Sequence, residues 1–318
     1  MAAEKKHSVS RPVSIWSDGT RLAADLWSMP DLGEEERVPG ILLCHGYGGR
    51  REQLNTAYAR KFAALGCVVL CFDYRGYGDS DGKLVRLGER TETQEDGSYA
   101  TRVAEVREVV NVTDQVEDAR SALAFLMGEP NVDPDRIGVW GSSMGAAMAL
   151  ETACRFNEVK ALVTQVGNVN PQFLVREFDE GKTVGNADLF KSASEAFADR
   201  IALARGTQSP FPQARAYPGS PEEYEIRGSL DWDHYRRFDP MRHLDQLEAA
   251  TLIIDAKDEE LFDPREYGEY LFGLIRDRLP SRYELIPGQH YDVYSGEGYY
   301  AALELEMEWF SKHLIGVS

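Results

Sequence analysis

The sequence predicts an α/β protein in which a mostly parallel sheet carries helices on both faces. Short apolar runs at residues 39–44, 67–74 and 159–166 alternate with segments of helical periodicity, such as residues 114–127. Alternation of this kind gives parallel strands joined by crossover helices. The second observation is a glycine-flanked turn at residues 141–145, between a strand and a helix. That turn places the candidate site at the end of a strand.

The turn Gly141-Ser142-Ser143-Met144-Gly145 follows the apolar run 136–140 and opens the small-residue, helix-forming stretch 146–154. So tight a turn holds its central residue in a strained backbone conformation, and the flanking glycines let strand and helix approach closely. We therefore expect the hydroxyl of Ser143 to stand above the sheet as a nucleophile. An ordinary glycine-rich turn is the alternative.

A serine hydroxyl is a weak nucleophile at neutral pH and needs a general base. Imidazole suits this role because it titrates near working pH. Of the six histidines, only His290 lies just beyond a late strand, residues 282–287, with a glycine close before it. We expect His290 to be the base, with a surface loop histidine as the alternative. His234 and His243 lie in charged segments and are expected to be solvated.

The acid that would orient His290 must come from a crowded segment. The strand 251–254 is followed by Asp255, Asp258, Glu259, Glu260 and Asp263. Asp255 still falls within the apolar run, whereas Asp258 lies on the loop, where a carboxylate can turn toward the base. We expect Asp258 to be the acid, with Asp255 as the second choice.

An oxyanion that forms during acyl transfer needs two backbone N–H donors. Met144, directly after the nucleophile, supplies the first. The second is expected from Tyr47, because the strand 39–44 runs into the loop His45-Gly46-Tyr47-Gly48-Gly49, whose glycines allow an amide to face inward. We expect His45 to brace this loop rather than act as a second base.

Together these segments resemble the α/β-hydrolase superfamily of serine hydrolases over nearly the whole chain. The resemblance rests on the turn 141–145, the loop 45–49, the stretch 73–80, Lys257-Asp258-Glu259 and Gly288-Gln289-His290. The chain order Ser, Asp, His is that of the superfamily. One departure is visible, since Pro-Gly-Gln precedes His290 in place of the more usual Gly-x-Gly.

The resemblance implies the α/β-hydrolase fold with an eight-stranded, mostly parallel sheet, a triad of Ser143, His290 and Asp258, no cofactor, and hydrolysis of an ester or related bond. We expect a carboxylesterase-type enzyme that forms an acyl-enzyme from a small or medium ester, neutral and apolar or aromatic. One alternative is a carbon–carbon bond or lactone hydrolase of an aromatic compound. The other is a ligand-binding protein of this fold without turnover.

Two stretches interrupt the alternation of strands and helices. Residues 167–247 are too long for an ordinary connection and divide the hydrolase core into 1–166 and 248–318. We expect a mostly helical cap there, whose aromatic rings either line a pocket over Ser143 or build the cap's own small core. The charged stretch 82–111 is expected to be a surface excursion and offers an arm for a homodimer. The rings of the cap are Phe173, Phe178, Phe190, Phe197, Phe211, Tyr217, Tyr224, Trp232, Tyr235 and Phe238.

Three further elements follow from local patterns. Asp18-Gly19 between two strand-like runs predicts an amino-terminal hairpin. Helices are expected over residues 52–65 and 297–314.

Composition restricts the classes of binding partner and the cellular compartment that we expect. A formal net charge of -18 disfavours nucleic acid and anionic membrane surfaces as partners. The partner that the resemblance implies is a small-molecule, ester-like substrate. No apolar run is long enough to span a bilayer, and the first residues show no signal-peptide pattern. We therefore expect a cytoplasmic protein with its four cysteines reduced. The cysteines have no metal-binding spacing.

Overall fold

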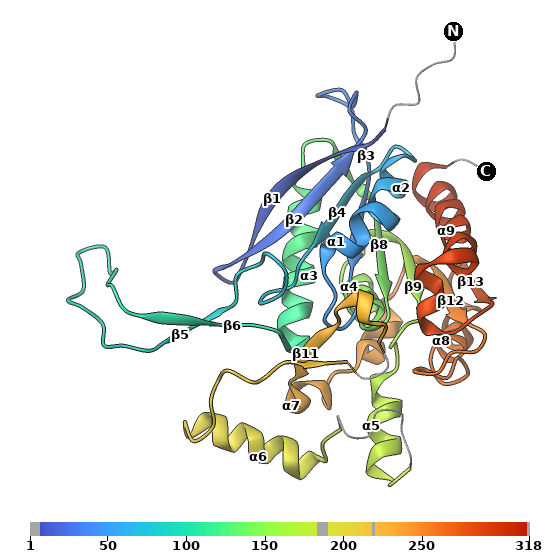
Figure 1. The fold of residues 1–318 in the computed structure, drawn as a ribbon. Helices are drawn as coiled ribbons and strands as arrows, with labels where there is room; N and C mark the ends of the chain where they lie inside the picture. The colour runs from blue at the N-terminus through green and yellow to red at the C-terminus, as the bar shows by residue number, and fades with distance from the viewer. Residues whose placement is uncertain (1–6, 183–189, 218–219, 317–318) are drawn as a thin grey trace.

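A computed structural model describes residues 7–182, 190–217 and 220–316 (Figure 1). Its centre is an eight-stranded sheet in which β1 and β2 pair antiparallel, β2 and β4 pair antiparallel, and every later neighbour pairs parallel. This mostly parallel sheet confirms the predicted fold class. In spatial order the strands are β1 (Val9–Ser17), β2 (Thr20–Ser28), β4 (Val68–Phe72), β3 (Val38–Cys44), β8 (Val132–Ser142), β9 (Val159–Gln165), β12 (Ala250–Ala256) and β13 (Ser281–Ile286).

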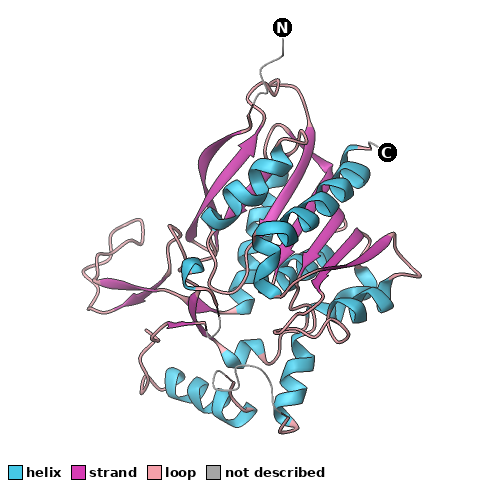
Figure 2. Cartoon of the chain, turned by 45° about the vertical axis from the view of Figure 1, so that its right-hand side comes forward, coloured by secondary structure: helices cyan, strands magenta, loops and turns pink. Residues whose placement is uncertain are grey.

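Both faces of the sheet are covered by helices (Figure 2). Alternate side chains of β3 enter different cores: Leu42 packs into one, and Ile41 and Leu43 into the other. A strand buried on both faces reads as a continuous apolar run, which is why residues 39–44 show no polar alternation. One core includes α3 (Val112–Met127), α4 (Met144–Arg155) and α8 (Gly268–Ile275), and the other includes α1 (Arg51–Leu54), α2 (Arg60–Ala63) and α9 (Gly296–Phe310).

The predicted hairpin and terminal helices are present with small differences. Asp18 and Gly19 have φ of 47° and 78°, and Ser17 pairs with Thr20, as a two-residue turn requires. The expected helix 52–65 is interrupted by a π-helical turn, η1 (Asn55–Ala59). The last helix ends at Phe310 and continues as a second π turn, η6 (Ser311–Ile315).

The stretch 82–111 leaves the body of the molecule as a hairpin of β5 (Lys83–Arg86) and β6 (Val103–Val106), which projects away from the sheet (Figure 1). Its end returns through β7 (Val109–Val110), which pairs in parallel with β11 (Arg227–Leu230). The surface excursion is therefore tied at its base to the 167–247 insertion.

The 167–247 insertion lies beyond the end of the sheet (Figure 1). Its helix α6 begins at Ala193, after a capping box between Ser192 and Glu195, while residues 183–189 lie outside the described part of the chain. The insertion contains α5 (Pro171–Asp179), α6 (Ala193–Ala204), β10 (Arg215–Ala216), η3 (Glu222–Tyr224), β11, α7 (Trp232–Tyr235) and η4 (Pro240–Gln246).

Within the described ranges, no helix combines the length and the apolar character needed to cross a bilayer. Cys44, Cys67, Cys71 and Cys154 are all buried and unpaired thiols, as expected for reduced cysteines.

One buried carboxyl group stands out in the core under the sheet. Glu306 of α9 is fully buried, and its Oε1 accepts a hydrogen bond of 2.7 Å from the indole N–H of Trp140 in β8. Burial raises the pKa of Glu306 to about 8. The folded protein therefore keeps a proton on Glu306 at neutral pH, whereas the unfolded chain releases it.

This difference predicts a pH-dependent stability. Between about pH 4.5 and pH 8 the folded state holds one more proton at Glu306 than the unfolded chain. As the pH rises through this range, the free energy of unfolding therefore falls by roughly 1.4 kcal/mol per pH unit because of this group. Glu306→Gln keeps an acceptor for Trp140 but does not titrate. We expect its stability gain over the parent, measured by urea unfolding at pH 5, 6.5 and 8, to grow with pH. A difference that stays constant with pH would show that Glu306 does not carry this proton.

Candidate active site

Ser143 occupies a strained turn between β8 and α4. Its φ of 55° and ψ of -124° lie outside the regions that non-glycine residues usually adopt, and such strain costs about 1–3 kcal/mol. A Cβ on Gly141 would lie 2.2 Å from the carbonyl oxygen of Gly145, and a Cβ on Gly145 would lie 2.1 Å from that of Cys44. Only glycine fits at both positions, so the sequence pattern and the backbone conformation agree.

His290 begins the 3-10 turn η5 (His290–Tyr294), beyond the end of β13. The imidazole is 2% exposed and packs edge-on against Phe262 at 5.6 Å between ring centroids. Its Nδ1 lies 2.9 and 3.0 Å from the two carboxylate oxygens of Glu259. A carboxylate at Nδ1 fixes the ring orientation and leaves Nε2 as the proton-accepting atom.

The carboxylate beside His290 is thus Glu259, and the expectation for Asp258 was wrong. Asp258 is exposed, and its backbone N–H donates to the carbonyl of Gly288. The side chain of Glu259, in contrast, is wholly buried. In the loop after β12, consecutive side chains point in different directions, so a shift of one residue exchanges the solvent-facing carboxylate for the inward-facing one.

Asp255, the second choice, lies within β12 and is buried. Burial, and next the neighbouring charge of Glu259, raise the pKa of Asp255 to about 8. A carboxyl that is neutral at pH 7 stabilises an imidazolium poorly. Asp255 is therefore no substitute for Glu259 at the histidine.

Hydrogen bonds within the loop and packing against His290 hold the side chain of Glu259 inward. Its Oε1 accepts hydrogen bonds from the backbone N–H groups of Leu261 and Phe262 at 3.0 and 3.4 Å, and Phe262 packs on His290. Glu260 faces the same segment, because its Oε2 accepts from the backbone N–H of His290 at 2.9 Å. The apolar pair Leu261-Phe262 is the one sequence signal for this inward turn.

The loop after β3 lies directly against the nucleophile. A Cβ on Gly46 would lie 3.1 Å from the Cβ and 3.6 Å from the Oγ of Ser143, and the turn closes with Gly49 N–H donating to the carbonyl of Gly46. Tyr47 follows Gly46 in this turn and lines the same pocket as Ser143. Met144 is the first residue of α4, where helix geometry leaves the N–H without an intrahelical acceptor. Both expected donors thus adjoin Ser143.

His45 is buried and packs edge-on against Tyr74 at 4.6 Å between ring centroids. Its Nδ1 lies 3.0 Å from the carbonyl of Gly46. Burial lowers the pKa of His45, so the ring is neutral at pH 7. These contacts fit a ring that supports the loop.

Comparison with known proteins agrees with this geometry. Residues 41–302 match the model of a family described as the alpha/beta hydrolase family. The chain belongs to the alpha/beta hydrolase family.

Relatives within this family are distant in sequence. An uncharacterized 31.7 kDa protein of Escherichia coli, from the traX-finO intergenic region, is 24% identical over 87% of this chain and 91% of its own. The thiohydrolase aneE of Aspergillus aculeatus is 30% identical over 46% of this chain and 38% of its own. The crystal structure of hypothetical protein PA2218 from Pseudomonas aeruginosa is 19% identical, with a TM-score of 0.71 over 99% of this chain and 98% of that one. The last similarity concerns the fold alone.

Ser143 and His290 of this hydrolase open onto one pocket of about 480 Å³. The pocket is lined by residues of the loop 45–49, of α1 and η1, and of the 167–247 insertion. Both expectations for the insertion's rings are met in part. Phe178 stacks on Phe190 at 5.3 Å and Phe197 is 58% exposed, so neither forms the pocket wall. The insertion's rings that line the pocket are Phe190, Tyr217, Tyr224, Trp232 and Tyr235.

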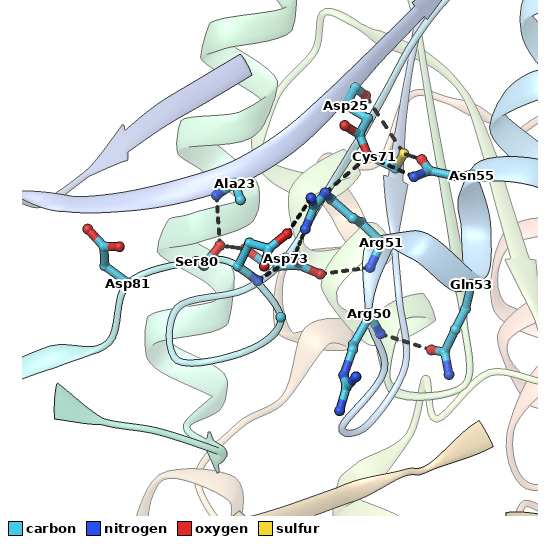
Figure 3. Close-up of polar contacts among 12 residues, drawn as sticks. Ala23, Asp25, Arg50, Arg51, Gln53, Asn55, Cys71, Asp73, Ser80 and Asp81 are labelled. Carbon is cyan, nitrogen blue, oxygen red and sulfur yellow. Dashed lines mark hydrogen bonds and ion pairs between the residues drawn. The ribbon is translucent and has the colours of Figure 1, made fainter. Parts of the chain in front are cut away.

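An ion-pair network anchors α1, the helix that follows the loop 45–49 (Figure 3). Arg51, the first residue of α1, pairs with Asp73 and Asp79 on one side and with Asp25 of β2 on the other. The carboxylate of Asp73 has no exposure and also accepts the backbone N–H of Arg51 at 2.8 Å. A Cβ on Gly78 would overlap this carboxylate. The segment 73–80, part of the family resemblance, therefore holds the start of α1, directly after the loop 45–49.

Removing one partner of a buried ion pair leaves the other charge uncompensated. We expect Arg51→Met to lower the free energy of unfolding by about 3 kcal/mol in urea titrations. Arg50 provides a matched control, because its side chain is 39% exposed and lies 3.7 Å from Glu225, itself 70% exposed. Arg50→Met should cost less than about 1 kcal/mol. Equal losses in the two variants would contradict the anchoring role of Arg51.

Proposed function

We propose that this hydrolase cleaves carboxylic esters through an acyl-enzyme on Ser143. The observation that carries the proposal is the opening of a strained serine and a carboxylate-paired histidine onto the same aromatic pocket. An ordinary surface histidine would have no reason to be buried with a carboxylate at Nδ1. Geometry of this kind recurs in serine hydrolases of unrelated fold.

In the proposed reaction Nε2 of His290 takes the proton of the Ser143 hydroxyl as Oγ attacks the ester carbonyl. The negative charge that develops on the carbonyl oxygen is held by the N–H groups of Met144 and Tyr47. Glu259 stabilises the imidazolium. His290 then gives its proton to the departing alcohol oxygen, and a water molecule activated by the same histidine hydrolyses the acyl-enzyme.

The pocket supports an aromatic or apolar substrate of moderate size. Aromatic rings of the lining pack beside the site residues: Tyr294 lies 6.2 Å from His290, and Tyr217 lies 5.1 Å from Tyr47, both between ring centroids. Aromatic walls with a few polar groups are typical of small-molecule sites. A volume near 480 Å³ accommodates an aromatic ring with a short chain rather than a polymer.

A thioester is the second candidate for the scissile bond. The relative of 30% identity is named a thiohydrolase, and its similarity spans less than half of this chain. The same nucleophile, base and oxyanion donors serve both bonds, since each passes through a tetrahedral oxyanion. Paired oxygen and sulfur esters of one acyl group would rank the two substrates.

A panel of variants with a fluorophosphonate probe tests the mechanism. The parent should gain one adduct by intact mass and hydrolyse 4-nitrophenyl esters, and Ser143→Ala should do neither. Glu259→Gln should slow labelling and hydrolysis by about 10³-fold, because it removes the charge that orients His290. Asp258→Asn, the adjacent exposed carboxylate, is the matched control and should stay within about twofold of the parent.

Two outcomes would contradict the proposal in different ways. A parent that takes no label and hydrolyses no ester would indicate a ligand-binding protein without turnover. Loss of activity in Asp258→Asn with normal activity in Glu259→Gln would return the acid role to the residue favoured by sequence alone.

A further inference from the structure

The pocket over Ser143 differs in charge from the rest of the molecule. The chain has 53 acidic and 35 basic residues. Within the described ranges, however, no aspartate or glutamate lines this pocket, while Lys191 and Arg215 do. A cavity whose described lining carries cations and no carboxylate is a local site for negative charge in this acidic protein.

Arg215 lies in the antiparallel pair of β10 and β11, on the face that lines the pocket. Residues two apart on a strand share a face, and Tyr217, two residues on, packs against Tyr47 of the oxyanion loop. Arg215 is paired directly with Gly228 of β11, where a Cβ would lie 3.1 Å from the hydroxyl oxygen of Tyr47. Since opposite residues of an antiparallel pair share a face, Arg215 and Gly228 both line the pocket wall above Tyr47.

The two cations of the pocket differ in their partners. The ammonium group of Lys191 pairs with the carboxylate of Asp199 on α6. The guanidinium of Arg215, by contrast, pairs with no carboxylate among the side chains that the structure describes, which exclude those of Glu223 and of residues 183–189. An exposed guanidinium that none of the described carboxylates neutralises is available to a ligand.

We propose that Arg215 selects substrates that carry a carboxylate on the part of the ester remote from the scissile bond. This inference rests on the proposed esterase function and narrows its substrate class to anionic aromatic esters. Guanidinium binds carboxylate with two parallel N–H···O bonds, a geometry that ammonium cannot offer. Selection of a carboxylate by Arg215 would replace the expectation of a neutral substrate, which was drawn from the net charge of the chain.

Matched substrates test the selection. They are 4-nitrophenyl esters of phenylalkanoic acids whose ring carries either a para carboxylate or a para carboxamide, in three chain lengths. The carboxamide has nearly the same shape without the charge, and the chain lengths sample the distance between Ser143 and Arg215. The readout is the ratio of kcat/KM for the two members of each pair.

For at least one chain length the parent should prefer the carboxylate by about tenfold, at the lower end for a charge-assisted contact because Arg215 is exposed. Arg215→Met should bring the ratio near one, and Arg215→Lys should keep part of the preference. Arg205 is the matched control, an exposed arginine at the end of α6 that does not line the pocket. Arg205→Met should retain the parent's preference.

A binding measurement separates this inference from the proposed function. The matching phenylalkanols, which have no ester, are titrated into Ser143→Ala by calorimetry, with and without Arg215→Met. Tenfold tighter binding of the carboxylate that depends on Arg215 supports the selection even if no ester is hydrolysed. Equal binding of the two alcohols, or a carboxylate preference that survives Arg215→Met, would overturn it.

Discussion

The strained backbone at Ser143 is the constraint on which the rest of the site depends. It is held because α4 starts immediately after β8, and because Gly145 meets the carbonyl of Cys44 at the end of β3. Gly46 of the loop 45–49 also lies close to the side chain of Ser143, so this loop and the serine are positioned against each other. Packing of the sheet's central strands thus provides the rigidity that the chemistry requires.

Charge is arranged around this contact in layers. Asp73 and Arg51 are paired beneath the oxyanion loop, Glu259 is buried against His290, and the pocket above carries no carboxylate among its described lining residues. The raised pKa of Asp255 keeps a second negative charge away from Glu259 at neutral pH.

Local patterns were sufficient for the sheet, the hairpin and the strained turn at Ser143, because each depends on residues close in sequence. The carboxylate that lies beside His290 was not accessible in this way. Choosing between Asp258 and Glu259 requires the path of the loop, which is determined by Phe262 packing on a histidine 28 positions later. The place of Arg215 in the pocket lining, away from the described carboxylates, was equally hidden, because it depends on where distant segments of the fold lie.

The most direct test of the central claim is a crystal structure of the protein after reaction with a fluorophosphonate. We expect phosphorus bonded to Oγ of Ser143, with one phosphonyl oxygen about 3 Å from the backbone nitrogens of both Met144 and Tyr47. Attachment to another residue, or a phosphonyl oxygen that contacts neither amide, would contradict it.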